Sequence, residues 1–259
     1  MNEVFVKKIN SGAFSNIYRV SKEPTADKIQ IRVNTDRPIA IKASCLETGS
    51  REYELMRQMD HKHLIPALVG YYDNQLSLYV IAMPLYAGDL VEFKQYVNFP
   101  AFLAQMIDAV QHMHQVGIVH CDIKPQNILI RSPTDHTYSL IDFNTAYVYR
   151  CGRLHKRFNP NYDSKTIVGT LNFCSIFAIF YCTPFRRDDM ESLFLTCLFL
   201  NSDIDESIFL RETNIEVHRK FRLCLDQYRT VQSLRAHKFY DAIDYASIKT
   251  MIMDDLNIQ

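Results

Sequence analysis

The sequence has no excess of charge of either sign and no apolar run long enough to cross a bilayer. Its 29 basic residues balance 29 acidic ones over 259 residues, so direct binding to nucleic acid or to an anionic membrane is not expected. The most apolar segment, SLFLTCLFL at 192–200, is shorter than the roughly 20 residues of a transmembrane helix, and is predicted to be a buried core helix. The N-terminal stretch MNEVFVKKIN lacks the apolar run of a signal peptide. A cytoplasmic or nuclear location is therefore expected.

Cysteine is present, but in no pattern typical of disulfides or zinc. The seven cysteines are odd in number and none belongs to a CxxC pair, which predicts reduced, mostly buried thiols. The chain also has no internal repeat, low-complexity tract or long flexible linker. Because 47% of its residues are apolar, it can bury one large core or two smaller ones.

Short β-branched and aromatic runs fill the first part of the chain. Five runs each predict a strand: VFVKKI, NIYRVS, RPIAIKAS, PALVGYY and LSLYVIAM. One helix interrupts them, with Ser50 as a candidate cap for REYELMRQM, where Tyr53, Met56 and Met59 share one face.

Helical periodicity dominates after a break near residues 86–89. AFLAQMIDAVQHMHQVG places apolar residues from Phe102 to Met113 on one stripe, and Gly117 stands where a C-terminal cap belongs. Two short strands, NILI and YSLID, follow, and the remainder reads mainly as helix. A small strand-rich lobe thus precedes a larger helical one, and the cleft between two lobes is a common ligand site.

The segment HCDIKPQN, residues 120–127, gathers the reactive side chains. Cys121 next to His120 allows a nucleophile with its base, or a pair of metal ligands. No second Cys/His pair has zinc spacing, and a cysteine that merely fills a buried position is favoured over a catalytic one. A third interpretation is a loop that aims Asp122 at a hydroxyl and Asn127 at a metal ion.

Four motifs support the third interpretation. Asp122 and Asn127 match the H-R-D-x-x-x-x-N loop, and IDFN, ending at Asn144, stands in the place of D-F-G. IAIK, ending at Lys42, matches V-A-I-K, and KINSGAFSNIY resembles the glycine-rich strand–loop–strand. In this order, and on these elements, the motifs resemble a eukaryotic-type protein kinase.

That resemblance implies an α+β, two-lobed protein kinase fold. A single kinase domain would cover residues 1–259. Its N-lobe, about 1–85, would hold an antiparallel sheet and one helix, and a hinge at about 83–89 would lead to a larger helical C-lobe at about 90–259.

The resemblance also assigns chemical roles. Phosphoryl transfer needs positioning and charge neutralisation more than covalent help from the protein. Asp122 would orient the acceptor hydroxyl and accept its proton, and Lys124 would neutralise charge at the γ-phosphate. Asp142 and Asn127 would bind Mg²⁺ or Mn²⁺, and Lys42 would bind the α- and β-phosphates of ATP.

Further nucleotide contacts follow from the same resemblance. Glu52 is the best candidate for the carboxylate that holds Lys42, with Glu54 and Glu47 as alternatives. The other residues implied at the nucleotide are Ile9, Gly12, Ile17, Leu85, Asp89 and Leu129. Two choices stay open: Asp89 contacts the ribose or only caps a helix, and either Met83 or Ala82 guards the back of the pocket. For the adenine, the backbone of Leu85 or of a neighbour is expected to make the contact.

The second half resembles one kinase group. GTLNFCSIFAIFYCTPFRRDDMESL at 169–193 and the later FYDAIDYASI are similar to the casein kinase 1 group, with the vaccinia-related kinases as a close comparison. The resemblance implies that Asp189 accepts backbone N–H bonds from the catalytic loop and that Thr170 touches Asp122 and Lys124. A compact chain with an eroded phosphate loop suits a viral or similarly divergent member.

Three departures from the kinase pattern bear on activity. In the phosphate loop only Gly12 remains, with Asn10 and Ser15 at the outer glycine positions, so weaker nucleotide binding is expected. Asn144 replaces the glycine of D-F-G and is the mildest substitute for a left-handed backbone. Cys121 replaces the arginine that holds an activation-loop phosphate, so independence from that phosphorylation is expected.

Three functions fit these motifs. The first is a Ser/Thr protein kinase, since Lys124 is typical of that class. The second is a pseudokinase scaffold, and the third is a small-molecule phosphotransferase, which the 169–193 segment disfavours. The basic run RCGRLHKR at 150–157 indicates acidic or phospho-primed protein substrates, or only a solvated loop. The sequence does not indicate an oligomeric state.

Overall fold

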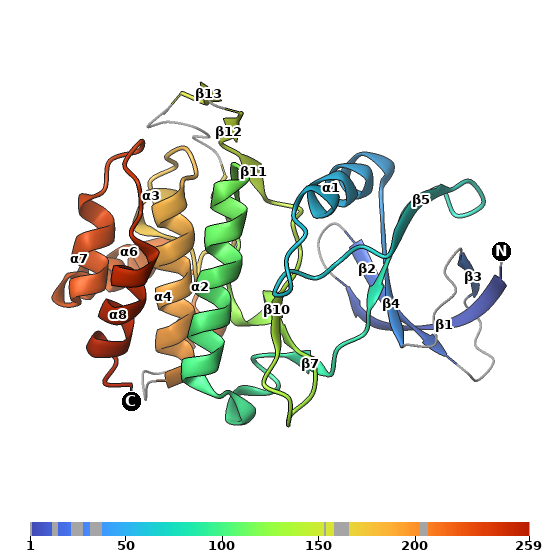
Figure 1. Ribbon diagram of the computed structural model, residues 1–259, viewed down its shortest axis with the longest axis horizontal. Coiled ribbons are helices and arrows are strands. Elements are labelled where there is room, and N and C mark those ends of the chain that lie inside the picture. The colour runs from blue at the N-terminus through green and yellow to red at the C-terminus, as the bar shows by residue number, and fades with distance from the viewer. Residues whose placement is uncertain are drawn as a thin grey trace. The chain divides into compact units, whose positions relative to one another are not determined.

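The chain divides into two compact units. The structure, a computed structural model, describes residues 2–11, 15–21, 28–31, 38–152, 154–157, 166–201 and 207–258. Unit 1 comprises Met1–Ala87 together with Ile141–Asn144, and unit 2 comprises Gly88–Leu140 and Thr145–Gln259 (Figure 1). The return of the chain to unit 1 at 141–144 brings Asp142 into that unit.

A six-stranded antiparallel sheet forms most of unit 1. Its order is β3-β1-β2-β4-β6-β5, with the bounds β1 Asn2–Ser11, β2 Ser15–Ser21, β3 Lys28–Ile31, β4 Ile39–Ser44, β5 Val69–Asp73 and β6 Leu78–Pro84. Side chains alternate between the two faces, and Val6, Ile39, Ile41 and Val80 form a buried cluster on one of them. All five predicted strands are present. The additional β3, KIQI, has only two apolar residues and gave too weak a pattern to be predicted.

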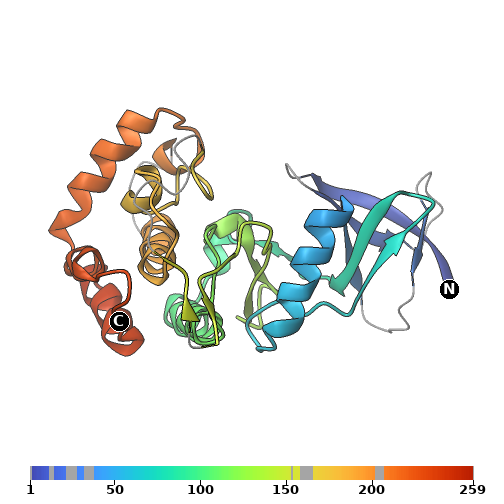
Figure 2. The same cartoon turned by 90° about the horizontal axis from the view of Figure 1, so that it is seen from above.

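Helix α1 (Leu46–Gln58) packs against β4, β5 and β6 (Figure 2). The prediction that Ser50 caps this helix was wrong, because the helix begins at Leu46 and the Ser50 hydroxyl donates to the Leu46 carbonyl (2.7 Å) inside it. The early start includes Gly49, a poor helix former. A Cβ at Gly49 would lie 2.6 Å from the Cβ of Tyr79 on β6, so the glycine lets the helix approach the sheet closely.

Unit 2 is mainly helical. Its helices are α2 Phe99–Gln115, α3 Ile176–Ile179, α4 Arg186–Asn201, α5 Ser207–Leu210, α6 Ile215–Cys224, α7 Arg229–Ala236 and α8 Tyr245–Asp255. Short 3-10 turns lie at Lys94–Tyr96, Pro125–Asn127 and Leu225–Gln227. Helix α2 packs against both α4 and α8 (Figure 1), and hydrogen bonds join its C-terminal end to the first turns of these two helices.

Small antiparallel sheets hold the connecting segments of unit 2. One has the order β10-β9-β7, with β7 Gly88–Asp89, β9 Ile128–Ile130 and β10 Tyr138–Leu140. Two more pair β8 Ile118–Val119 with β11 Tyr147–Val148, and β12 Arg150–Cys151 with β13 Leu154–His155. The strands predicted from NILI and YSLID are β9 and β10. Strands β8 and β9 flank residues 120–127, which carry the reactive side chains.

The ends of α2 follow ordinary capping rules. At its start the Asn98 side chain accepts the Ala101 N–H (3.1 Å), which satisfies one of the donors left open in a first turn. Gly117 follows its C-terminus with φ +90°, as predicted, and a Cβ there would lie 2.4 Å from the Arg150 carbonyl oxygen. The glycine is therefore required both by its backbone conformation and by a close approach.

Helix α4 is the central helix of unit 2. Every residue from Arg187 to Phe199 is buried, so the prediction that SLFLTCLFL is a core helix is confirmed. Among the described residues, no helix is both long and apolar enough to cross a membrane. All seven cysteines are free thiols, as predicted, but the prediction that most of them are buried was wrong: only Cys174 and Cys197 are buried.

The predicted order of the fold is confirmed: an antiparallel sheet with one helix comes first, and a larger helical part follows.

Candidate functional site

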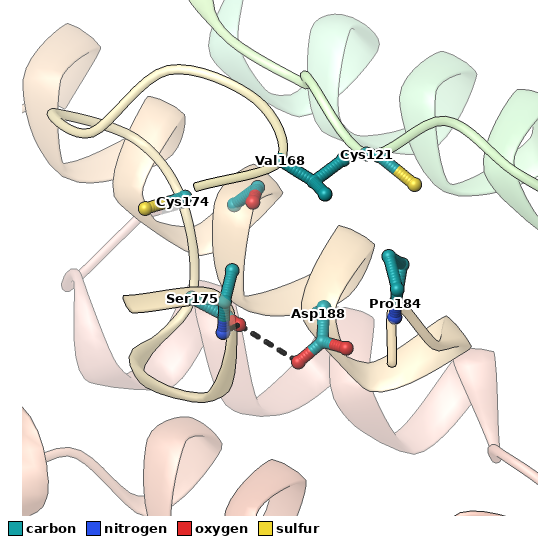
Figure 3. A pocket seen from close by; sticks show the side chains of 8 residues that line it. Cys121, Val168, Cys174, Ser175, Pro184 and Asp188 are labelled. Carbon is teal, nitrogen blue, oxygen red and sulfur yellow. Dashed lines mark hydrogen bonds between the residues drawn. The ribbon is translucent and has the colours of Figure 1, made fainter. Parts of the chain in front are cut away.

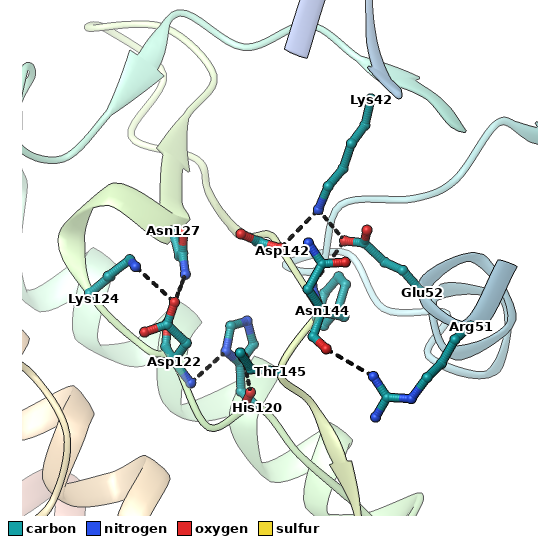
Figure 4. Close-up of polar contacts among 11 residues, drawn as sticks. Lys42, Arg51, Glu52, His120, Asp122, Lys124, Asn127, Asp142, Asn144 and Thr145 are labelled. Carbon is teal, nitrogen blue, oxygen red and sulfur yellow. Dashed lines mark hydrogen bonds and ion pairs between the residues drawn. The ribbon is translucent and has the colours of Figure 1, made fainter. Parts of the chain in front are cut away.

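In unit 1 a buried lysine lies between two carboxylates. The Nζ atom of Lys42 on β4 lies 2.6 Å from Oε1 of Glu52 on α1 and 2.8 Å from Oδ1 of Asp142 (Figure 4). Lys42 is only 4% exposed. Burial by itself would lower the pKa of Lys42, but the two carboxylates outweigh it and raise this pKa, so the ammonium charge is secure. Of the three carboxylates considered from the sequence, the structure selects Glu52.

Helix α1 also holds the segment from Asp142 to Asn144. Oε1 of Glu52 accepts the Phe143 N–H (3.1 Å), and Nη1 of Arg51 donates to the Asn144 carbonyl (2.8 Å; Figure 4). Arg51 was missed in the sequence, because a backbone contact across so many residues leaves no motif. Two adjacent helix residues thus fix both sides of Phe143.

The backbone of this segment differs from the expectation. The left-handed conformation expected at Asn144 lies instead at Asp142, with φ +67°. Asn144 is not among the described residues with positive φ, so the position does not require glycine in this conformation. The replacement of the D-F-G glycine by Asn144 therefore carries no left-handed backbone strain.

Strand register shows which residues share a face with Lys42. Directly opposed residues of antiparallel strands point to the same face. Lys42 is opposed by Ile17 on β2 and by Ile81 on β6, and Ala40 is opposed by Met83. Met83 therefore lies on the Lys42 face and Ala82 on the opposite one, which favours Met83 as the residue behind the nucleotide. Ala40, two residues before Lys42, also lies on this face, and it was not among the residues that the sequence analysis expected near the nucleotide.

The remaining unit 1 residues implied for the nucleotide are placed as follows. Ile9 is 48% exposed and lies at an irregularity in the β1–β2 register, between Lys8 and Asn10. The Leu85 N–H donates to the Pro38 carbonyl (3.0 Å), so this N–H is already used within unit 1. Gly12 lies outside the described residues.

In unit 2 the segment from His120 to Asn127 forms a compact polar cluster around Asp122. Oδ2 of Asp122 accepts from Nζ of Lys124 (2.8 Å) and from Nδ2 of Asn127 (2.9 Å; Figure 4). Nδ2 of Asn127 also donates to the Asp122 carbonyl (2.8 Å). Lys124 reaches the Thr170 hydroxyl at 2.6 Å, as predicted. Oδ1 of Asp122 is buried and has no hydrogen-bond partner in the described part of the chain.

Asp189, in the first turn of α4, holds this loop by its backbone. Its Oδ2 accepts the His120 N–H (2.7 Å) and its Oδ1 accepts the Cys121 N–H (2.8 Å), which confirms the anchoring role predicted for it. Cys121 has φ +68°, an uncommon conformation for a residue with a side chain. The two bonds from Asp189 fix that conformation immediately before Asp122.

Cys121 is not suited to nucleophilic chemistry. Burial, and then the nearby charges of Asp189 and Asp188, raise the pKa of the Cys121 thiol well above its usual value, whereas a nucleophile needs a thiolate. Nδ1 of His120 accepts the Asp122 N–H (3.2 Å), so this nitrogen is engaged with the backbone. Cys121 instead lines a small pocket, with Val168, Cys174, Ser175, Ala178, Pro184, Asp188 and Ser192 (Figure 3).

The described part of the chain gives no support to the metal interpretation of His120 and Cys121. Across the residues that the structure describes, no group of three His, Cys, Asp or Glu side chains could hold a metal ion. A tetrahedral zinc site needs such a group.

Asp89 and Leu129 lie opposite each other on β7 and β9. Oδ1 of Asp89 accepts the Val91 N–H (2.9 Å) and the Glu92 N–H (3.1 Å), so Asp89 caps the following turn. Leu129 is half-buried between the fully buried Ile128 and Ile130, which places it on the opposite face of β9.

The basic run at 150–157 is only partly described, since Arg153 lies outside the described residues. Nζ of Lys156 lies 4.5 Å from the centre of the Tyr147 ring, and a guanidinium nitrogen of Arg150 donates to the Gln115 carbonyl. Lys156 is therefore held against Tyr147 on β11, and Arg150 against the C-terminal end of α2.

Comparison with known proteins gives one consistent result. The sequence pattern described as the protein kinase domain matches residues 4–222. A probable myosin light chain kinase of Dictyostelium discoideum is 30% identical over 148 residues, 55% of this chain and 45% of its own length. A second such kinase of that organism is 26% identical over 223 residues, 78% of this chain and 56% of its own.

A rat protein is similar over a longer stretch. The 3-phosphoinositide-dependent protein kinase 1 of Rattus norvegicus is 24% identical over 271 residues, 94% of this chain and 48% of its own length. The chain thus spans about half the length of the curated relatives it matches.

Proposed function

Since the chain belongs to the protein kinase domain family, we propose that it transfers the γ-phosphate of ATP to serine or threonine hydroxyls of proteins. The observation that carries this proposal is the state of Asp122. One carboxylate oxygen is held by Lys124 and Asn127, while the other is buried and has no partner among the described residues. A buried acceptor without a donor is costly, and an acceptor hydroxyl would satisfy it.

Asp122 and Lys124 have distinct roles in this reaction. Asp122 orients the substrate hydroxyl and accepts its proton as the oxygen attacks phosphorus. Lys124, held between Asp122 and Thr170, places a positive charge beside the transferring group. Lys124 also supports the Ser/Thr assignment by its position two residues after Asp122.

Asn127 and Asp142 fit a hard divalent cation. The amide nitrogen of Asn127 is turned to Asp122 by two hydrogen bonds, which leaves its carbonyl oxygen as the ligand atom. The Asp142 side chain is 37% exposed, so the carboxylate is accessible. Oxygen ligands of these two kinds suit Mg²⁺ or Mn²⁺, which when bound neutralises phosphate charge.

Other residues are proposed to bind the nucleotide. Lys42, kept charged by Glu52, holds the α- and β-phosphates. Ile17, Ala40 and Met83 share the Lys42 face of the sheet and would provide an apolar surface for adenine. The proposal also includes Ile9, Gly12, Leu85, Asp89 and Leu129. Since the Leu85 N–H is bonded to Pro38, Leu85 would contribute its carbonyl or side chain, and a neighbouring residue the N–H.

The casein kinase 1 group is the proposed subgroup. This rests on the segment from Gly169 to Leu193 and on the Asp244–Tyr245 pair. The proposed substrates are acidic or phospho-primed proteins, supported by the basic run at 150–157. The same proposal includes a viral origin and a cytoplasmic or nuclear location. It does not include direct binding to nucleic acid.

A pseudokinase scaffold is the second candidate, favoured by the polar residues where β1 ends and β2 begins. Oδ1 of Asn10 accepts the Ser11 N–H (2.7 Å), and the Ser11 hydroxyl donates to Asn16 (2.9 Å). Asn10 stands at a position where the kinase pattern has a glycine that lets the backbone approach phosphate, and its replacement favours weak nucleotide binding. The intact charges of Lys42, Asp122 and Asp142 favour catalysis.

Transfer itself is tested with γ-labelled ATP and casein, in Mg²⁺ and in Mn²⁺. Incorporation of label by the wild type and its loss in Asp122→Asn support the proposal. No incorporation by the wild type in either metal favours the scaffold.

Nucleotide binding is expected to raise the thermal unfolding midpoint in a metal-dependent way. At about tenfold excess over its dissociation constant, Mg·ATP should raise the midpoint by about 3–5 °C, because a ligand that binds only the folded state stabilises it. A thermal-shift titration with Mg·ATP and Mn·ATP measures this, with each metal alone and ATP in EDTA as controls. No shift at millimolar Mg·ATP or Mn·ATP contradicts the proposed nucleotide site.

Activity is expected to be independent of activation-loop phosphorylation. Cys121 stands where an arginine would hold that phosphate, and a thiol of raised pKa has no charge to offer it. Phosphatase treatment should therefore leave the rate of casein phosphorylation unchanged. A large loss that rephosphorylation restores would show that another cation performs this task.

A further inference from the structure

A chain of hydrogen bonds joins the C-terminal helix to the catalytic loop within unit 2. The hydroxyl of Tyr245, the first residue of α8, lies 2.7 Å from Nδ1 of His114 near the end of α2. Nε2 of His114 lies 2.9 Å from Oδ2 of Asp189. The side chains of His114 and Asp189 are 2% and 1% exposed, so water does not compete for these bonds.

The direction of each proton follows from the groups involved. A carboxylate only accepts hydrogen bonds, so Nε2 of His114 carries a proton and donates it to Asp189. In a neutral imidazole the other nitrogen is then an acceptor, and Nδ1 must receive the Tyr245 O–H. Burial lowers the pKa of His114, and this outweighs the raising effect of Asp189, which keeps the ring neutral. Tyr245 therefore selects the tautomer that can donate to Asp189.

The ring and the backbone of His114 are held separately. The Tyr149 hydroxyl donates to the His114 carbonyl (2.5 Å), so the main chain at this point has its own support. The ring depends on its two nitrogen contacts. Loss of the Tyr245 hydroxyl would thus affect the ring orientation and tautomer without releasing the end of α2.

The series of hydrogen bonds ends at the backbone of Cys121, the residue before Asp122. With His114 as third donor, Asp189 accepts three N–H bonds, the other two from the backbone of His120 and Cys121. A carboxylate fixed by all three cannot rotate away from the loop. Its hold on Cys121 maintains φ +68°, and this conformation sets the direction in which Asp122 leaves the backbone.

We propose that Tyr245 is a positioning residue for phosphoryl transfer, acting through His114 and Asp189 on the backbone that presents Asp122. Helix α8 is on this view part of the catalytic apparatus and not only a covering helix. Asp244 serves the same end, since its carboxylate accepts the Ser247 N–H (3.1 Å) and so fixes the first turn that carries Tyr245. The inference rests on the proposed kinase function for its consequence, but not for its geometry.

Hydrogen exchange tests the geometry without any assay of activity. Tyr245→Phe keeps the ring and removes only the hydroxyl, and Tyr240→Phe is the matched control because Tyr240 is 57% exposed. The amide protons of His120 and Cys121, followed by NMR, should exchange about fivefold faster in Tyr245→Phe, as expected for loss of one buried hydrogen bond. They should not change in Tyr240→Phe. Unchanged exchange in Tyr245→Phe, or an equal effect in both variants, overturns the proposal.

A double-mutant cycle tests the route through His114. His114→Phe keeps an aromatic ring but removes both ring nitrogens, so Tyr245→Phe should add little to it, in exchange rates and in kcat. Tyr245→Phe alone should lower kcat about fivefold and leave the KM for Mg·ATP unchanged. Additive effects, or a change confined to KM, would show that Tyr245 only fills space. If His114→Phe does not fold, the comparison of Tyr245→Phe with Tyr240→Phe still decides.

The two proposals fail in different ways. If the wild type transfers no phosphate but the His120 and Cys121 amides exchange faster in Tyr245→Phe, the proposed function is wrong and the positioning chain is retained. If the wild type is active and exchange and kcat are unchanged in Tyr245→Phe, the kinase assignment is retained and the positioning role is wrong.

Discussion

Replacing Asp122 by asparagine is expected to lower the rate of phosphoryl transfer by about 10²–10⁴-fold, the usual loss for a positioned general base. The variant keeps the size of the side chain and the acceptor that faces Lys124 and Asn127. It loses the negative charge that attracts the hydroxyl proton. Nucleotide binding should persist, because Asp122 is not among the proposed metal ligands.

Asp142→Asn provides the contrast. Asp142 is a proposed metal ligand and a partner of Lys42, so its neutral form should weaken metal-dependent nucleotide binding as well as turnover. Label transfer to casein gives the rates, and the Mg·ATP thermal shift gives the binding. Full activity in Asp122→Asn would show that HCDIKPQN is not the catalytic loop. Binding equal to wild type in both variants, with no transfer by wild type, would favour the scaffold.

Replacing Gly169 by alanine is expected to destabilise unit 2 by about 2–4 kcal/mol. The left-handed backbone accounts for about 1–2 kcal/mol and the steric overlap for the rest. Gly169 has φ +92°, and a Cβ there would lie 2.2 Å from the Cys121 carbonyl oxygen and 3.5 Å from Oδ1 of Asp122. The overlap would push on the backbone that presents Asp122, so kcat should fall together with stability.

Gly152→Ala separates the two causes. Gly152 also has positive φ, +58°, but no atom lies within 4 Å of a Cβ placed there. This variant should lose only about 1–2 kcal/mol and keep its activity. Urea unfolding and casein phosphorylation of both variants measure the difference. Equal losses in the two variants would mean that the contact between Gly169 and Cys121 is unimportant.

The grouping of the candidate loop residues could be predicted from the sequence because it is local. Asp122, Lys124 and Asn127 lie on one short loop, so their spacing alone brings them together, and the structure joins them by direct hydrogen bonds. Strands β4 and β6 were predictable for the same reason, since a short run of β-branched and aromatic residues between polar turns is a property of the chain itself. The end of α2 at Gly117 was signalled by a single residue.

Contacts between distant segments were decided only by the tertiary structure. Glu47, Glu52 and Glu54 all lie on or beside the helix predicted after Lys42. The rotation of α1 on the sheet determines that Glu52 meets the lysine. Met83 and Ala82 are likewise neighbours in sequence. The β4–β6 register, which fixes which side chains point to which face, places Met83 with Lys42.

The sequence by itself determined which charged groups are candidates for the proposed reaction, because those groups are encoded in short motifs. Only the tertiary structure decided how the groups are held, through Arg51 on Asn144 and through Tyr245 and His114 on Asp189. The physical reason is that these bonds depend on the relative placement of helices that lie far apart in the chain. Packing of buried faces sets that placement, and no local pattern records it.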